Sequence, residues 1–588
     1  MKLWKKDERG LYEDLFDETK YNKRWLNRVY EETYERINTF KANHPWQKSD
    51  KITAYKLRIA DQLYNNQKYY EAIELYNTSL CFAKNGSKYI GFAYAARANC
   101  FQRLNKINES KIDVKLVKEC SDLLTDGARP ARFVFEGTDG SMNDHDSYED
   151  IADEDTIDLT SDDEPETISL STNHIKFLVQ SKNEFSAVAV DDIDVGDVIF
   201  SESCYVADNF VDIYKRCCIC LNGLYKNLIP CKNCTSALFC YDKCYKSDIH
   251  RLECCIKQCA IVSPSIAVNF INPVIRSIWM GTRMFSKMEQ MMDFVLKTLA
   301  SAPDNDTHKA DSYNNYEAFL QLPADKLSEE MIPLLYALCK MILKIVDISC
   351  IYSTQEYHRF LMHLITQHYL ILSKNATIHL MEYHVRSIEP ECLYDLSLSI
   401  HSSWFQHSCA PNAALIHRDG ITECIILCPI KKGEQIYINR KQTFSRFSAQ
   451  RRQFQWDKFV TKCNCIRCKH CPVDTPENDL MHSDPNFIFL KNQTNLSGQC
   501  AEYSDEMIET LKLKCKSILM KYGREEWCKE IESVIWFYSI LLSHYASTSP
   551  NLSIKLACLR KSHFDLCYYK RPVDLPAKRR MRLYSTFG

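Results

Sequence analysis

Hydrophobic positions recur at helical spacing along residues 52–116, with polar side chains between them. Small residues take matching places in two successive helix pairs, Ala60 and Ala72 in the first and Ala98 and Ser110 in the second. Ala60 and Ala98 are 38 residues apart, which is close to the period of about 34 in tetratricopeptide repeats. The spacing predicts either two such repeats or an amphipathic bundle, since two units fall short of the usual three.

The pattern changes to that of strands after residue 170. Alternating apolar and polar residues over 171–208, with Gly196 at a turn, predict strands and a hairpin. Longer apolar-periodic stretches between 256 and 395 predict helices, and short alternating runs between 396 and 442 predict strands again. Helical patterns return beyond residue 500. The chain is therefore predicted to mix helices and sheets in an α+β class.

An acidic stretch separates the first helices from the first strands. Residues 141–170 hold twelve Asp or Glu and no Lys or Arg, so charge repulsion predicts that they stay unfolded. Within them, Ile157, Asp158 and Leu159 precede a run of three acidic residues. This order resembles a SUMO-interacting motif, which adds a strand to the edge of a partner sheet. A plain acidic linker explains the same residues.

Composition narrows the class of protein. A length of 588 residues predicts roughly three or four folded units, and a hydrophobic fraction of 45% fits a globular chain. The net charge of -2 predicts no general attraction to nucleic acid. We find no apolar N-terminal leader and no apolar run of about 18 residues, so we expect a nuclear and cytoplasmic protein without a membrane span. The 29 cysteines then indicate metal ligation rather than disulfides.

Eight metal-ligating residues fall within residues 217–254. They form two C-x2-C pairs, a C-x3-C pair and an H-x3-C pair, namely Cys217, Cys220, Cys231, Cys234, Cys240, Cys244, His250 and Cys254. Eight ligands supply two tetrahedral zinc sites, and metal binding would supply the folding free energy of so short a segment. Two further cysteines, Cys218 and Cys255, leave the register of two ligands open.

A third cysteine group lies at Cys463, Cys465 and Cys468. Three thiolates need a fourth ligand to close a structural zinc site. Cys409, in the stretch "WFQHSCAPN", is the natural candidate.

The order of these elements carries a resemblance. A strand-rich segment, the eight-ligand cluster, a helical stretch, "HSCAPN", "GEQI" and a terminal C-x-C-x2-C resemble the SET and MYND domain-containing family of protein-lysine methyltransferases. The helical start is similar to that of the repeat-bearing fourth member of the family or an insect-type relative. The resemblance implies a SET domain of short strands, split by a MYND zinc finger and flanked by helical, tetratricopeptide-like regions at both ends.

The resemblance also implies boundaries and ligand sets. The units would be an N-terminal segment at 1–50, repeat-like helices at 51–135, an acidic linker at 136–170, SET strands at 171–216, the finger at 217–254, a helical insert at 255–395, the SET core at 396–442, a post-SET zinc segment at 443–470 and C-terminal helices at 471–588. Interleaved ligation would place Cys217, Cys220, Cys240 and Cys244 on one zinc ion and Cys231, Cys234, His250 and Cys254 on another. Cys409, Cys463, Cys465 and Cys468 would bind the third.

In this family the methyl donor is S-adenosylmethionine, and the resemblance points to Gln406, His407 and Asn375 as donor-binding positions. Gln406 stands where the family has Asn, and Arg440 and Phe459 stand at two tyrosine positions of the catalytic centre. Glu184, Phe185 and Ser186 replace the glycine- and arginine-containing donor loop. A fixed charge at Arg440 would repel a sulfonium donor.

Two hypotheses of function follow. The chain is either a protein-lysine methyltransferase in transcriptional or chromatin regulation, or a catalytically silent, zinc-stabilised co-regulator scaffold. The resemblance implies protein partners, among them co-repressors of the histone deacetylase type, bound by the finger and the repeat-like helices. A monomer without direct nucleic-acid contact is expected.

Overall fold

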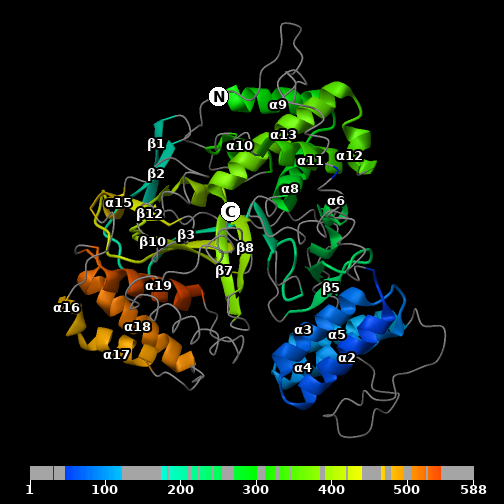
Figure 1. The fold of residues 1–588 in the computed structure, drawn as a ribbon, viewed down its shortest axis with the longest axis horizontal. Helices are drawn as coiled ribbons and strands as arrows, with labels where there is room; N and C mark the ends of the chain where they lie inside the picture. Colours follow the sequence, from blue (N-terminus) through cyan, green and yellow to red (C-terminus); the bar gives the residue numbers. More distant parts are fainter. Residues whose placement is uncertain are drawn as a thin grey trace, which may run out of the picture.

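The fold is described from a computed structural model (Figure 1). The described residues are 31, 47–121, 174–181, 184–209, 214–221, 226–241, 244–247, 249–254, 271–300, 312–324, 327, 331–344, 346–384, 391–418, 421–439, 465–470, 479–495, 505–524 and 527–543. The acidic linker with Ile157, Asp158 and Leu159 lies outside them, as do Arg440, Phe459, Cys463 and Cys255. Within these ranges the predicted mixture of helices and sheets is confirmed.

Four helices form the N-terminal unit, two antiparallel pairs at one end of the molecule (Figure 1). They are α2 (Asp50–Asn65), α3 (Tyr69–Phe82), α4 (Lys88–Arg103) and α5 (Ile107–Ser121). The small residues at matching places are all buried, Ala60, Ala72 and Ala98 completely and Ser110 nearly so. Their burial lets neighbouring helices approach closely, which is the role that the spacing predicts for them.

The cysteine-rich segment (residues 217–254) follows the first strands and packs against this helical unit. It contains a two-stranded sheet of β5 (Leu228–Pro230) and β6 (Leu238–Cys240), a short turn η2 (Cys244–Lys246) and helix α6 (Ile249–Glu253). Ile229 belongs to the core of the N-terminal helices, and Cys81 of α3 belongs to the core of the cysteine-rich segment. The two units therefore share buried surface.

Short strands form the central sheets. One has the order β1 (Ile175–Ser181), β2 (Glu184–Ala189), β12 (Gln435–Ile438) and β9 (Gln406–His407). Another has the order β10 (Ala413–Arg418), β11 (Ile421–Ile426) and β3 (Val198–Ser203). Strands from before the cysteine-rich segment thus pair with strands from more than 180 residues later. Gly196 has a φ of +89° at the predicted turn, a conformation that glycine adopts without steric cost.

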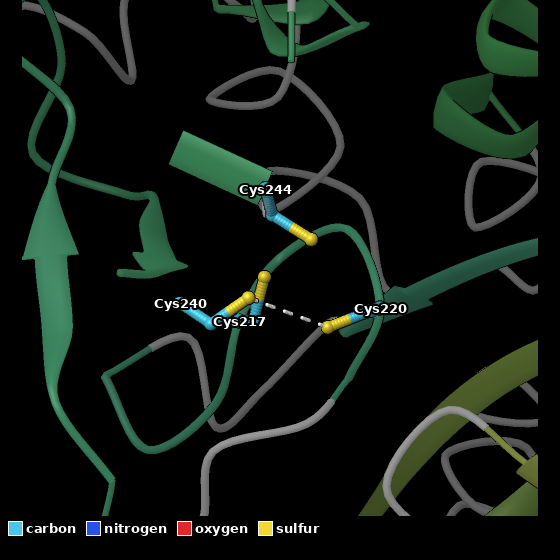
Figure 2. A group of neighbouring side chains, drawn as sticks. All are labelled: Cys217, Cys220, Cys240 and Cys244. Atoms are coloured by element: carbon cyan, nitrogen blue, oxygen red, sulfur yellow. Dashed lines mark hydrogen bonds between the residues drawn. The ribbon is translucent and has the colours of Figure 1, made fainter. Parts of the chain in front are cut away.

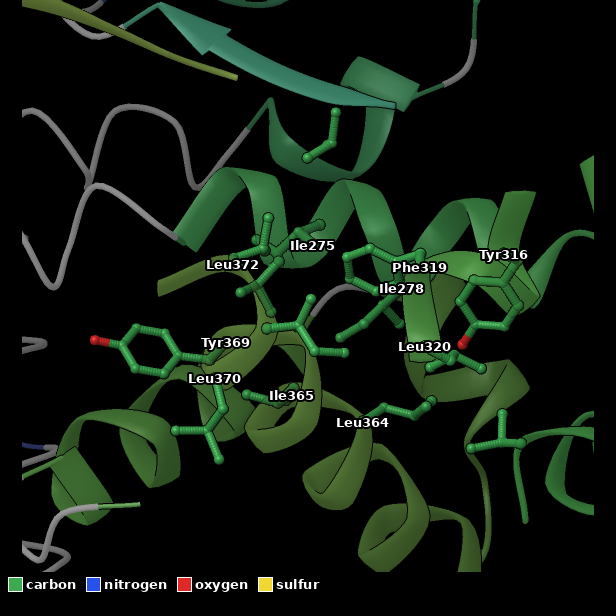
Figure 3. Packing of buried hydrophobic residues seen from close by; sticks show 14 of the residues in the cluster. Ile275, Ile278, Tyr316, Phe319, Leu320, Leu364, Ile365, Tyr369, Leu370 and Leu372 are labelled. Carbon is green, nitrogen blue, oxygen red and sulfur yellow. The ribbon is translucent and has the colours of Figure 1, made fainter. Parts of the chain in front are cut away.

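Helices of the insert surround one large core (Figure 3). They are α8 (Ile271–Thr282), α9 (Met288–Ala300), α10 (Ser312–Gln321), α11 (Ile332–Ile342), α12 (Val346–Ile351) and α13 (Gln355–Asn375). Ile275, Phe319 and Ile365 come from three different helices and meet there.

The helical region ends earlier than the sequence predicts. After Asn375 the chain forms β7 (Thr377–His384) and β8 (Glu391–Leu398), which join β4 (Val206–Asn209) in a third sheet. The prediction of helix to residue 395 is wrong because apolar and polar residues alternate after Ala376, in a run too short to stand out beside a 21-residue helix.

The C-terminal unit is helical, as predicted. Its elements are α15 (Ile466–His470), α16 (Asp479–His482), α17 (Pro485–Asn495), α18 (Asp505–Tyr522) and α19 (Lys529–Ser543). Helix α19 packs on β10. Among the helices within the described ranges, none is long and apolar enough to cross a membrane.

Candidate metal centres and donor-site strands

The first candidate metal centre gathers four cysteines from three parts of the cysteine-rich segment (Figure 2). Cys217 and Cys220 come from the turn before β5, Cys240 ends β6 and Cys244 begins η2. Their sulfur atoms all lie within 4.8 Å of one another, and those of Cys220 and Cys240 are 3.9 Å apart. Four zinc–sulfur bonds of about 2.3 Å in a tetrahedron place sulfurs about 3.8 Å apart. The four thiols can therefore hold one zinc ion.

The second centre combines residues that follow β5 with residues of α6 and its end. Cys231, Cys234, His250 and Cys254 bring their ligand atoms within 4.8 Å of one another, and all four are buried. Cys231 and Cys254 are 3.8 Å apart at sulfur, and the Cys234 sulfur is 3.4 Å from Nε2 of His250. A tetrahedral zinc ion with one imidazole requires about these separations.

The structure also distinguishes Cys217 from its neighbour Cys218 as a member of the first tetrad. Cys217 groups with Cys220, Cys240 and Cys244, whereas Cys218 lies near His250 and Glu253. The interleaved sets implied by the resemblance are thus brought together in space, with Cys218 in neither tetrad.

The thiols of each tetrad share hydrogen bonds with one another. Hydrogen bonds with Cys217 and Cys220 lower the pKa of Cys240, and hydrogen bonds with the same two thiols raise the pKa of Cys244. Hydrogen bonds with Cys234 and Cys254 likewise lower the pKa of Cys231, while the pKa of Cys254 is raised. The thiolate is the form of cysteine that binds metal, so binding of a zinc ion would release the protons that remain.

A third centre joins parts of the chain that are distant in sequence. Cys409, Cys465 and Cys468 lie within 4.8 Å of one another at sulfur, with 3.7 Å between Cys409 and Cys468. Arg467, buried between the last two, contacts the Cys409 carbonyl at 3.4 Å and forms an ion pair with Glu532 of α19 at 2.9 Å. This ion pair connects the third centre to the C-terminal helices. No sequence signal points to it.

The stretch around Gln406 forms a hydrogen-bonded edge between strands. Strand β9 pairs in parallel with β12, and Nε2 of Gln435 donates to Oε1 of Gln406 at 2.9 Å. The Tyr437 hydroxyl donates to Oε1 of Gln435 at 2.8 Å. Gln406 is therefore held by a neighbouring side chain in the described structure. Nε2 of His407 is 3.5 Å from the Cys409 sulfur.

Asn412 fixes the same edge. Its carboxamide accepts from the Tyr437 backbone N–H at 2.7 Å and donates to the Gln435 carbonyl at 3.0 Å. Both bonds are made to the backbone of β12, so Asn412 holds that strand beside the "HSCAPN" loop. No local pattern in the sequence indicates these two bonds, because Gln435 and Tyr437 lie more than 20 residues further along the chain.

Asn375 ends helix α13 and is almost fully buried. Its amide nitrogen donates to the carbonyls of Pro323 at 2.6 Å and Ile371 at 2.8 Å. Both amide hydrogens of Asn375 are thus used within the protein.

The segment at the family's donor loop is a regular strand here. Phe185 and Ser186 lie in β2 and are buried, and the Phe185 ring stacks on Trp404 with 4.7 Å between centroids. A buried aromatic stack takes the place of an open, glycine-containing loop.

A buried ion pair between α4 and α5 also forms hydrogen bonds to the cysteine-rich segment. Arg97 and Asp113 are both fully buried and make two hydrogen bonds of 2.7 Å with each other. Arg97 also donates to the Leu228 carbonyl of β5 at 2.9 Å, and Asn227 donates to Asp113 at 2.6 Å. Helices α4 and α5 are in this way bonded to the segment that carries the first two centres.

Comparison with known proteins gives these clusters a context. No protein-family model matches the chain. A SET and MYND domain-containing protein of Dictyostelium discoideum is 35% identical over 106 residues, 18% of this chain and 25% of that protein. A histone-lysine N-methyltransferase of Arabidopsis thaliana is 23% identical over 380 residues, 63% of this chain and 68% of that protein. The resemblance to SET and MYND domain-containing proteins is confirmed. The chain spans only a quarter of the length of the Dictyostelium protein.

A solved structure also aligns with the chain. The SET domain of LSMT bound to lysine and AdoHcy has 11% sequence identity and a TM-score of 0.25, and the alignment covers 70% of this chain and 94% of that one.

Proposed function

We propose that the chain is a zinc-stabilised SET and MYND protein of the S-adenosylmethionine-dependent protein-lysine N-methyltransferase type. One observation carries most of the proposal: three groups of cysteine and histidine side chains, in the chain order that the resemblance implies, each lie close enough together to share a metal ion, the third of them through Cys409, Cys465 and Cys468. The similarity to a histone-lysine methyltransferase over 380 residues adds to it.

The proposed reaction asks little covalent chemistry of the protein. S-adenosylmethionine, when bound, would supply a methyl group on a cationic sulfur. The nitrogen of a neutral lysine amine would bond to the methyl carbon in line as the carbon–sulfur bond breaks, which gives a methylammonium and the neutral thioether S-adenosylhomocysteine as the leaving group. Positioning and electrostatics then carry the catalysis. The contribution of this chain would be a rigid frame, in which Asn412 fixes β12 and the third centre ties residues 465–468 to Cys409.

The proposal extends to partners and setting. The substrate would be a lysine side chain of a protein, in transcriptional or chromatin regulation in the nucleus and cytoplasm. The finger at 217–254 and repeat-like helices at both ends would bind proteins such as histone deacetylase-type co-repressors. Ile157, Asp158 and Leu159 would bind SUMO.

The second candidate is a silent co-regulator scaffold on the same zinc-stabilised frame. Two contacts favour it: the Gln406 carboxamide is hydrogen-bonded to Gln435, and Phe185 is stacked on Trp404. Both occupy places where the family contacts its donor.

Methyl transfer by the wild-type chain distinguishes the candidates, and restoring the family residues measures what Gln406 and Arg440 cost the reaction. Gln406→Asn combined with Arg440→Tyr is expected to raise methyl transfer to a histone or peptide-library substrate by about tenfold or more, because one well-placed hydrogen bond is worth about 1 kcal/mol and a repelling charge is removed. Transfer of a labelled methyl group measures the rate.

Gln290→Asn, at a hydrogen-bonded surface glutamine of α9, is the matched control and should leave the rate unchanged. An unchanged rate in the double variant, with wild-type activity already measurable, would show that these two positions do not limit the reaction.

A further inference from the structure

Glu253 occupies the space behind the imidazole of the second metal centre. It is the last residue of α6 and is fully buried. Its Oε1 lies 3.2 Å from Nδ1 of His250, while Nε2 of the same ring faces the Cys234 sulfur at 3.4 Å. The two ring nitrogens thus face a carboxylate on one side and the ligand cluster on the other.

This arrangement selects one form of the imidazole. A neutral imidazole carries a hydrogen on one nitrogen and a lone pair on the other. A carboxylate at Nδ1 accepts that hydrogen and leaves the Nε2 lone pair to the metal. The carboxylate also fixes the plane of the ring, which a free side chain would not maintain.

Glu253 is itself held from the helical insert. Arg276 of α8 donates to it through two nitrogens, at 2.7 Å and 2.6 Å. Arg276 also contacts Asp208 at 3.3 Å and the Ala207 carbonyl, both from β4. Burial opposes the charge of Arg276, but Glu253 and Asp208 outweigh burial and raise its pKa.

The network is buried. Asn272, one turn before Arg276, donates to the second oxygen of Asp208 at 2.8 Å. The side chains of Arg276, Glu253 and Asp208 are at most 2% exposed. A buried charge pair of this kind is costly to form and contributes little net stability, so a role in fixing geometry accounts for it better.

We propose that Glu253, clamped by Arg276, is a positioning residue for the second metal centre, and that through this pair helix α8 of the insert is coupled to zinc binding in the cysteine-rich segment. The coupling also reaches Cys254. This ligand directly follows Glu253, and its backbone N–H donates to the His250 carbonyl at 2.8 Å. Glu253 therefore lies on the same helical turn as the two ligands His250 and Cys254. The proposal does not depend on methyl transfer.

The test compares zinc affinities of the full-length chain and its variants by competition with a chromophoric chelator. Glu253→Gln keeps the shape of the side chain but loses the charge that holds Arg276. Loss of such an outer partner weakens metal binding about 10- to 100-fold. We expect that loss at the second centre and none at the first.

Cobalt substitution tells the centres apart, because one nitrogen and three sulfurs give a different visible spectrum from four sulfurs. We expect only the spectrum of the centre with His250 to change in Glu253→Gln. Arg276→Lys, which keeps a charge but not the paired geometry, should give a smaller change of the same kind, and amide exchange in α8 should quicken in both variants.

Glu202→Gln is the matched control, since Glu202 accepts from Nδ1 of His401 at 2.9 Å, away from the metal centres. It should leave zinc affinity and the cobalt spectrum unchanged. Unchanged affinity and spectrum in folded Glu253→Gln would overturn the proposal and leave an ordinary buried ion pair. If Glu253→Gln does not fold, Arg276→Lys decides by the same two readouts.

Discussion

Removing zinc with a strong chelator is expected to unfold the cysteine-rich segment and to loosen the helices that pack on it. Structural zinc contributes an apparent folding free energy of about 10–16 kcal/mol in finger peptides, far more than the short strands β5 and β6 can replace. Helix α3 should be affected as well. Asn77 donates to the Tyr214 carbonyl at 3.0 Å, and the Cys81 thiol contacts the Ala237 carbonyl at 3.8 Å.

Hydrogen exchange on the full-length chain measures this effect. Protection should fall by at least a hundredfold across residues 217–254 and measurably in α3, and it should return when zinc is added back. Helix α13, in the separate core of the insert, is the internal reference and should change least. Unchanged exchange across the segment after verified zinc loss would mean that metal does not hold this fold.

The second large effect is expected at Arg97. Replacing it with Met leaves the fully buried Asp113 without its ion-pair partner, so its carboxylate must stay charged in the interior or take up a proton, and either change costs stability. Removing one partner of a buried pair costs about 3–5 kcal/mol. The Leu228 carbonyl also loses its donor, so the contact between α4 and β5 should weaken together with the helical unit. Chemical denaturation followed by circular dichroism measures the change in unfolding free energy.

Two variants make the Arg97 result specific. Arg97→Met with Asp113→Leu removes both charges, and it should recover part of the lost stability because no unpaired charge remains. Lys431→Met breaks an ion pair of 2.6 Å between two exposed side chains and should leave the unfolding midpoint unchanged. Equal losses of unfolding free energy in Arg97→Met and Lys431→Met would mean that the buried ion pair matters no more to stability than the exposed one.

Much of the frame could be predicted because its signals are local. Ligand pairs two or three residues apart can close on one ion, so the spacing predicts that Cys217 and Cys220 share a site, while the resemblance implies the distant pair that completes it. Small residues at matching helical positions, such as Ala60 and Ala98, anticipated close helix packing. Both patterns are set by neighbours along the chain.

The contacts between units could not be predicted in the same way. Arg97 stands among alanines on a helix and looks like part of a solvated face, yet it is buried against β5, more than 130 residues later. Glu253 sits beside two metal ligands, but its partner Arg276 is placed only by the packing of α8. The sequence pattern does not reveal the end of the insert helices at Asn375 for a different reason. The alternating run that follows is short and lies next to a long helix.

The donor site depends on both kinds of information. The short alternating runs between 396 and 442 predict strands in the region that holds β9 and β12, but no pattern in them indicates that Gln435 bonds to the Gln406 carboxamide. Binding of S-adenosylmethionine at the paired strands β9 and β12 is therefore the feature that decides between the two candidate functions.

Calorimetric titration of the zinc-loaded, full-length chain with S-adenosylmethionine measures directly whether the chain binds the methyl donor. Zinc content and a folded circular dichroism spectrum establish that the protein is intact before titration. If the chain is a methyltransferase, we expect saturable binding with a dissociation constant in the micromolar range, which corresponds to a binding free energy of about -8 kcal/mol. No binding heat from the intact, zinc-loaded protein would contradict the methyltransferase proposal and leave the silent scaffold as the function of this chain.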